Sequence, residues 1–71
     1  MTSEKFAEIV GKAVKDGIIE ERVAPMLNDR TQFDTPRGAV DDARDYGIIG
    51  NVAWLWFVSR IKEADSGSNP Q

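Results

Sequence analysis

The segment IIGNVAWLWFVSRIKEA, residues 48–64, contains the longest apolar run in the chain and decides which fold class the sequence can form. As a strand, it would set Trp54 and Trp56 on one face and Leu55 and Phe57 on the other. As a helix, it has two apolar faces. Periodicity does not separate these interpretations for so short a run. Its length, and the lack of a second convincing strand elsewhere, favour a helix.

The predicted helix has one apolar face that continues to its end and a second that gives way to charge. The first face, which we assign to the core, consists of Trp54, Phe57, Val58 and Ile61. The second face consists of Ile49, Val52, Ala53 and Trp56, followed by Arg60 and Glu63. An apolar centre with a charged rim is typical of a protein contact surface, and tryptophan is frequent in binding hot spots. The predicted partner-binding residues are therefore Ile49, Val52, Trp56 and Arg60, with burial of this face in the monomer as the alternative.

An amphipathic helix is predicted near the N-terminus, over residues Ser3–Asp16. Its apolar residues recur at helical spacing and form one stripe, consisting of Phe6, Ile9, Val10, Ala13 and Val14. Thr2 or Ser3 can cap its first turn. Gly17 follows its end and suits the left-handed backbone that often terminates a helix.

Two shorter helices are predicted in the middle of the chain. Residues Ile19–Asn28 share an apolar face, but Pro25 implies either a kink one turn before it or a helix that starts at the proline itself. A threonine–proline pair then predicts a helix over Pro36–Tyr46. The polar loop Asn28–Thr35 between them is expected to be anchored to the core by Phe33.

One sequence pattern occurs twice. Ala13-x-x-x-Gly17-Ile18-Ile19 is matched by Ala43-x-x-x-Gly47-Ile48-Ile49. The match is compatible with a duplicated helical hairpin, or with two helices that share a glycine cap and an apolar residue after it. Because repeat architectures normally need three or more units, the second interpretation is favoured.

The 71 residues suffice for one small helical domain, which we place at residues 1–64, followed by a polar, disordered tail at 65–71. The chain has no histidine and no cysteine, which excludes Ser–His–Asp and Cys–His nucleophilic sites and the usual zinc sites. Asp41, Asp42 and Asp45 are expected on a solvated helix face. We therefore predict no enzymatic activity, no catalytic residues, no metal and no cofactor.

Nine basic and twelve acidic residues give a net charge of −3, which disfavours nucleic acid and anionic membrane surfaces as partners. No apolar run approaches the roughly 20 residues of a membrane-spanning helix, and the N-terminus lacks a secretion signal. A cytoplasmic location is therefore expected.

The sequence thus predicts an all-α bundle of three to four short helices without enzymatic activity. We expect a protein–protein interaction module that binds another protein or a second copy of itself, as a small acidic regulator or inhibitor does. The alternative is a helix-turn-helix DNA-binding regulator whose reading helix spans residues 36–46. The three aspartates of that helix would repel phosphate.

Overall fold

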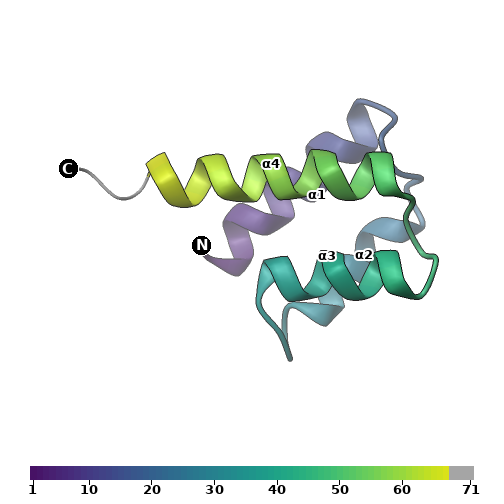
Figure 1. The fold of residues 1–71 in the computed structure, drawn as a ribbon, viewed down its shortest axis with the longest axis horizontal. Helices are drawn as coiled ribbons and strands as arrows, with labels where there is room; N and C mark the ends of the chain where they lie inside the picture. The colour runs from purple at the N-terminus through teal and green to yellow at the C-terminus, as the bar shows by residue number, and fades with distance from the viewer. Residues whose placement is uncertain (68–71) are drawn as a thin grey trace.

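In the computed structural model, which describes residues 1–67 and side chains through Asp65, the chain folds into four helices joined by short connections (Figure 1). They are α1 (Ser3–Lys15), α2 (Val23–Arg30), α3 (Pro36–Asp45) and α4 (Asn51–Gly67). Residues 1–67 contain no strand. The expected all-α fold is therefore confirmed.

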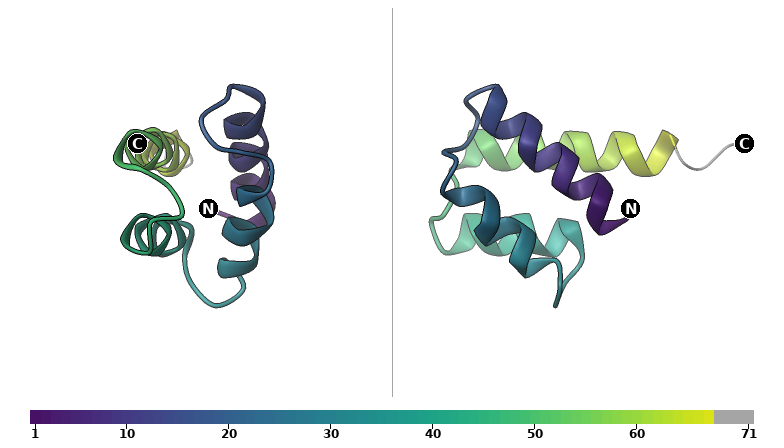
Figure 2. Two further views of the ribbon diagram at one scale, coloured as in Figure 1. Left: turned by 90° about the vertical axis from the view of Figure 1, so that its right-hand side faces the viewer. Right: turned by 180° about the vertical axis from the view of Figure 1, so that it is seen from behind.

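The four helices form two layers. Helices α3 and α4 lie side by side in one layer, and α1 and α2 lie in the other (Figure 2, left). The core fills the space between the layers, and its largest fully buried side chains are Phe6, Val10, Leu27, Val40 and Phe57. The rings of Phe6 and Phe57 meet across the layers with their centroids 6.3 Å apart. This contact joins the first helix to the last.

Helices α1 and α3 end in the same type of turn. Gly17 and Gly47 have φ angles of +77° and +76°, a left-handed conformation that strains any residue with a Cβ atom. In each turn, the N–H of the residue after glycine donates to a carbonyl oxygen at the helix end, as in a Schellman motif. The donor–acceptor pairs are Ile18 to Ala13 and Ile48 to Ala43, each at 2.8 Å.

The correspondence between the two hairpins extends beyond these turns. Buried residues of the α1–α2 hairpin have buried counterparts in the α3–α4 hairpin at a constant separation of 30 residues. The pairs are Ile9 and Ala39, Val10 and Val40, Ala13 and Ala43, Ile19 and Ile49, Val23 and Ala53, and Leu27 and Phe57. The sequence match therefore reflects two hairpins of the same construction, which is a wider similarity than a shared helix cap.

The middle helices follow the sequence pattern with one shift. Helix α2 begins at Val23, so that Pro25 lies in its first turn, where a backbone N–H has no partner within the helix. Ile19 is excluded from the helix and is buried in the turn that precedes it. Helix α3 starts directly after Thr35, whose hydroxyl caps it as predicted and accepts a hydrogen bond from a first-turn N–H at 3.1 Å.

Helix α4 starts and ends later than the segment 48–64 implies. It continues to Gly67, so the disordered tail expected from Asp65 does not begin there. No helix-breaking residue interrupts residues 62–66, and Asp65 also lies 3.5 Å from the N-terminal ammonium of Met1. The remainder of the expected tail, residues 68–71, lies outside the described residues.

Phe33 does not anchor the α2–α3 loop to the core. Its side chain is 88% exposed, and the loop is held instead by hydrogen bonds of its own turn. The N–H of Phe33 donates to the carbonyl oxygen of Arg30 at 3.0 Å, and the Thr31 hydroxyl donates to that of Asn28 at 2.7 Å. The prediction for this ring was therefore wrong, because local turn bonds suffice to shape the loop.

The two glycine turns should be sensitive to a single methyl group. We expect Gly47→Ala to lower the free energy of unfolding by about 1 kcal/mol, since alanine must adopt a left-handed backbone there. Gly11→Ala is the control, because Gly11 lies inside α1 with open space around it, and alanine should stabilise the helix by about 0.5–1 kcal/mol. Urea denaturation of both variants measures the difference. Equal effects of the two substitutions would contradict the role of the turn.

Candidate partner-binding surface

The outer face of α4 carries apolar side chains that the core does not use. Val52 is 80% exposed and Leu55 is 56% exposed, and Trp56 beside them is half-buried. They lie three and four residues apart, so they share one side of the helix. With the polar residues of the next turn they line a shallow depression of about 430 Å³. We call this set the α4 surface: Val52, Leu55, Trp56, Ser59, Arg60 and Glu63.

Trp56 is held in place from two sides. Its ring contacts the Phe57 ring edge to face, with centroids 5.1 Å apart and an interplanar angle of 87°. The guanidinium of Arg60 lies over the Trp56 ring, 5.0 Å from its centroid. Contacts of both kinds are favourable. Trp56 is therefore a fixed aromatic platform at the edge of the core, with part of its surface open to solvent.

Three of the four predicted partner-binding residues lie together on this surface: Val52, Trp56 and Arg60. Ile49 does not, because its side chain is only 7% exposed and belongs to the core. The helix begins at Asn51, so Ile49 lies in the turn before it, where its N–H donates to the carbonyl oxygen of Ala43 at 3.2 Å. An apolar residue at this point of a Schellman turn packs back on the preceding helix.

The side of α4 that faces inward differs from the predicted one. Buried residues recur every four positions, at Ile49, Ala53, Phe57 and Ile61. The predicted second face combined two residues of this buried stripe, Ile49 and Ala53, with the more exposed Val52 and Trp56. Leu55 was left out of the predicted surface, because it was considered only as part of a strand. Its position three residues after Val52 was the signal that places both on one side.

Trp54 lies on a third side of α4, against α3, and is half-buried, whereas the sequence assigned it to the core. Its indole N–H donates to the carboxylate of Asp41 at 2.7 Å, and the Arg44 guanidinium lies 4.1 Å from its ring centroid. Arg37 donates to the same carboxylate at 3.1 Å. A tryptophan N–H needs such an acceptor when it leaves water, which explains why Trp54 stays at the edge of the core.

These contacts change the acidity of Asp41. The hydrogen bond from Trp54 lowers the pKa of this carboxyl below its ordinary value, and the hydrogen bond and positive charge of Arg37 add to the effect. Partial burial acts in the opposite direction and is outweighed. The carboxylate of Asp41 therefore serves to join α3 to α4.

The other two aspartates of α3 also face arginines. Asp42 lies 3.5 Å from Arg30 of α2, and Asp45 lies 3.9 Å from Arg44. Within residues 1–67 there is no group of three or more acidic side chains arranged to hold a metal ion. Each of the three carboxylates of α3 is thus balanced by an arginine within 4 Å.

Comparison with known proteins gives no relative on which to build. No protein-family model, no curated protein and no solved structure matches the chain. In the part of the chain that the structure describes, no helix has the length and apolar character needed to cross a membrane. The candidate surface therefore has to be judged from its own geometry.

The Trp54–Asp41 contact predicts a pH dependence of stability. Because folding lowers the pKa of Asp41, its stabilising effect is complete above the ordinary carboxyl pKa, near 3.8, and is lost as the pH falls through the lowered value. The Asp41 side chain is 40% exposed, so we expect the effect to be about 0.5 kcal/mol or less. Asp41→Asn should make the acid limb of the stability curve shallower, measured by urea denaturation between neutral and acidic pH.

Asp29→Asn is the matched control, because Asp29 lies exposed on α2 and its replacement removes one carboxylate without touching Trp54. Acid limbs of equal slope for the wild type and Asp41→Asn would show that this carboxylate does not join α3 to α4.

Proposed function

We propose that the chain is a non-enzymatic protein–protein interaction module that binds its partner through the α4 surface. The observation that carries the proposal is the exposure of Val52 and Leu55, 80% and 56%, directly beside the fixed ring of Trp56. Exposed apolar side chains scattered singly are ordinary on proteins, whereas adjacent ones with a polar rim are typical of contact surfaces.

The core does not need these side chains. The buried stripe of α4 already packs against α1 and α3, and the matching stripe of the α1–α2 hairpin completes the other layer. Val52 and Leu55 are absent from that core and from the side chains packed against it. A role outside the monomer accounts for apolar residues that the fold itself leaves in water.

The α4 surface also has the composition of a binding site. Trp56 supplies a large ring whose position is set by Phe57 and Arg60, so little side-chain entropy is lost when a partner covers it. Tryptophan and arginine are the residues most enriched in hot spots. A small regulator or inhibitor that acts by covering a surface of its partner fits this arrangement.

Site-specific photocrosslinking in the native host tests the proposal. A photoreactive amino acid at position 52, on the α4 surface, should give a discrete covalent adduct with another protein or a second copy of this chain. The same amino acid at exposed position 29, on α2, should give none. The adduct at position 52 should disappear in Trp56→Ala, since truncation of a hot spot costs about 2 kcal/mol or more of binding free energy.

Folding controls accompany the crosslinking. The double substitution Val52→Ser, Leu55→Ser should leave the free energy of unfolding within about 0.5 kcal/mol per site, because both side chains are exposed. Phe57→Ala should cost about 3–5 kcal/mol, because its ring is fully buried. Absence of any adduct at position 52 from folded protein in its host would overturn the proposal.

A further inference from the structure

A second depression lies next to the α4 surface, between α1 and α4. It has a volume of about 320 Å³ and shares Arg60 and Glu63 with the α4 surface. Helix α1 crosses α4 at an angle (Figure 2, right), and the depression follows α1 for about two turns, over residues 5–12, and α4 for about one turn, over residues 60–64. We call it the α1–α4 groove; its lining consists of Lys5, Glu8, Ile9, Lys12, Arg60, Glu63 and Ala64.

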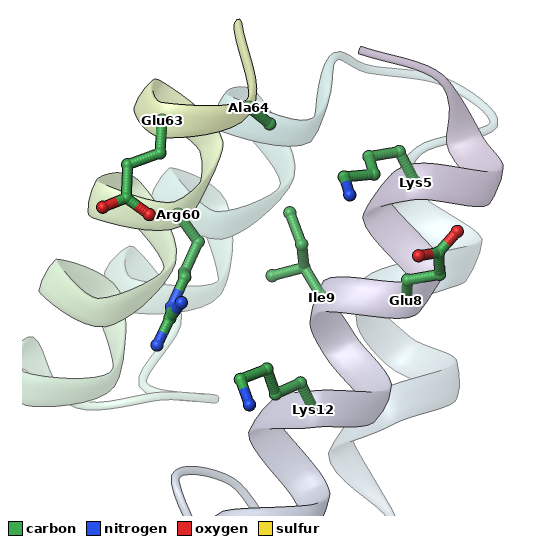
Figure 3. Close-up of a pocket in the computed structure, with 7 residues that line it drawn as sticks. All are labelled: Lys5, Glu8, Ile9, Lys12, Arg60, Glu63 and Ala64. Atoms are coloured by element: carbon green, nitrogen blue, oxygen red, sulfur yellow. The ribbon is translucent and has the colours of Figure 1, made fainter. Parts of the chain in front are cut away.

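Three cations and two carboxylates line this groove, which gives it a net charge of +1 in a chain whose net charge is −3. Figure 3 shows the amines of Lys5 and Lys12 reaching from α1 into the space between the helices, and the guanidinium of Arg60 reaching along it from α4. The carboxylates of Glu8 and Glu63 turn away from Ile9, whose side chain lies between the three cations. The groove therefore has three cations around Ile9, a core side chain of which only 8% is exposed.

These three cations have few carboxylate partners within the part of the chain that the structure describes. Among the side chains of residues 1–65, Lys5 has no ion-pair partner, and Lys12 has only Asp16, at 3.6 Å, with half of the Lys12 side chain exposed. Arg60 pairs with no carboxylate of these residues but lies over the Trp56 ring. Elsewhere on the molecule, arginines face carboxylates, as Arg30 faces Asp42 and Arg37 faces Asp41. Lys15 and Lys62 also form no ion pair with the described side chains, so what distinguishes Lys5, Lys12 and Arg60 is that they line one depression, where a ligand with negative charge can meet all three.

From this arrangement we infer that the α1–α4 groove binds an acidic amphipathic helix of the partner protein, beside the α4 surface. The inference rests on the proposed function, because it names the chemistry of the partner at a site continuous with the α4 surface through Arg60. Lys5 and Lys12 are two turns apart on α1, which is about 10.5 Å along the helix axis. Two carboxylates two turns apart on a partner helix match that spacing.

The same spacing places an apolar residue of the partner over the centre of the groove. A residue one turn after the first carboxylate lies midway between the two and faces the same side of the helix. There it lies over Ala64, which is half-buried, and over the small exposed part of Ile9. Recognition of an amphipathic helix in a groove between two helices is a recurring mode of protein binding.

A designed peptide tests the inference without knowledge of the natural partner. The probe is a fluorescein-labelled helical peptide of about 16 residues, with two glutamates two turns apart and a leucine midway. Fluorescence anisotropy should show saturable binding that weakens as the salt concentration rises. A peptide with lysines in place of the glutamates should not bind.

Charge-reversal variants locate the binding. Lys5→Glu, Lys12→Glu should weaken peptide binding by about tenfold or more, whereas Lys15→Glu, Lys62→Glu should change it by less than about twofold. The two variants change the net charge equally, and Lys12 and Lys15 both lie in the last turn of α1, so the loss of favourable helix-dipole contact is matched. If Lys5→Glu, Lys12→Glu does not fold, the double variant Lys5→Ser, Lys12→Ser replaces it. Its loss of peptide affinity should be smaller than that expected for the charge reversal, because the positive charges are removed and not reversed.

Several results would overturn the inference. They are no binding of the acidic peptide by the folded wild type, equal weakening in the two charge-reversal variants, or a dimer in sedimentation that Lys5→Glu, Lys12→Glu dissociates, which would show that a second copy covers the groove. The crosslink at position 52 distinguishes a failure of the groove inference from a failure of the proposed function. If the adduct forms and is unaffected by Lys5→Glu, Lys12→Glu, the α4 surface binds a partner but the groove does not take part.

Discussion

The contact between Phe57 and Phe6 decides how α4 lies in the molecule. Phe57 is fully buried, and its ring packs against Phe6 across the two layers of helices. Once Phe57 points inward, the positions four residues before and after it must follow, and Ala53 and Ile61 complete the stripe. Val52 and Leu55 are then turned outward. The same contact that closes the core thus leaves two apolar residues exposed on the last helix.

The resemblance between the two hairpins shows that this exposure is not a requirement of the fold. The first hairpin is built on the same buried positions, 30 residues earlier. Where α4 has Val52 and Leu55, the first hairpin has Arg22 and Pro25. A polar residue is therefore compatible with the position of Val52, which supports a function for the apolar one. Trp56 corresponds to Met26, another partly exposed apolar residue, so this site differs mainly in the size of the side chain.

Local signals in the sequence predicted the helices well, because caps and glycine turns act over a few residues. Thr35 before Pro36 started α3 where expected, and Gly17 and Gly47 ended α1 and α3. The inward side of α4 was less predictable, because its segment is apolar on several sides and only tertiary packing selects one. The error at Ile49 follows from placing the helix start three residues too early. Leu55 was missed although its position three residues after Val52 places both on one side of the helix. The outward position of Phe33 had no signal in the sequence, since an aromatic residue in a loop is compatible with either side.

If the α4 surface binds a partner, it is open in the isolated chain and covered in the host. Hydroxyl-radical footprinting measures this directly, by comparing side-chain oxidation in the purified monomer and in intact host cells. We predict that oxidation of Leu55 and Trp56 falls strongly in cells relative to that of Phe33, which lies on the α2–α3 loop. Unchanged relative oxidation of Leu55, Trp56 and Phe33 would show that nothing covers the surface and would contradict the account.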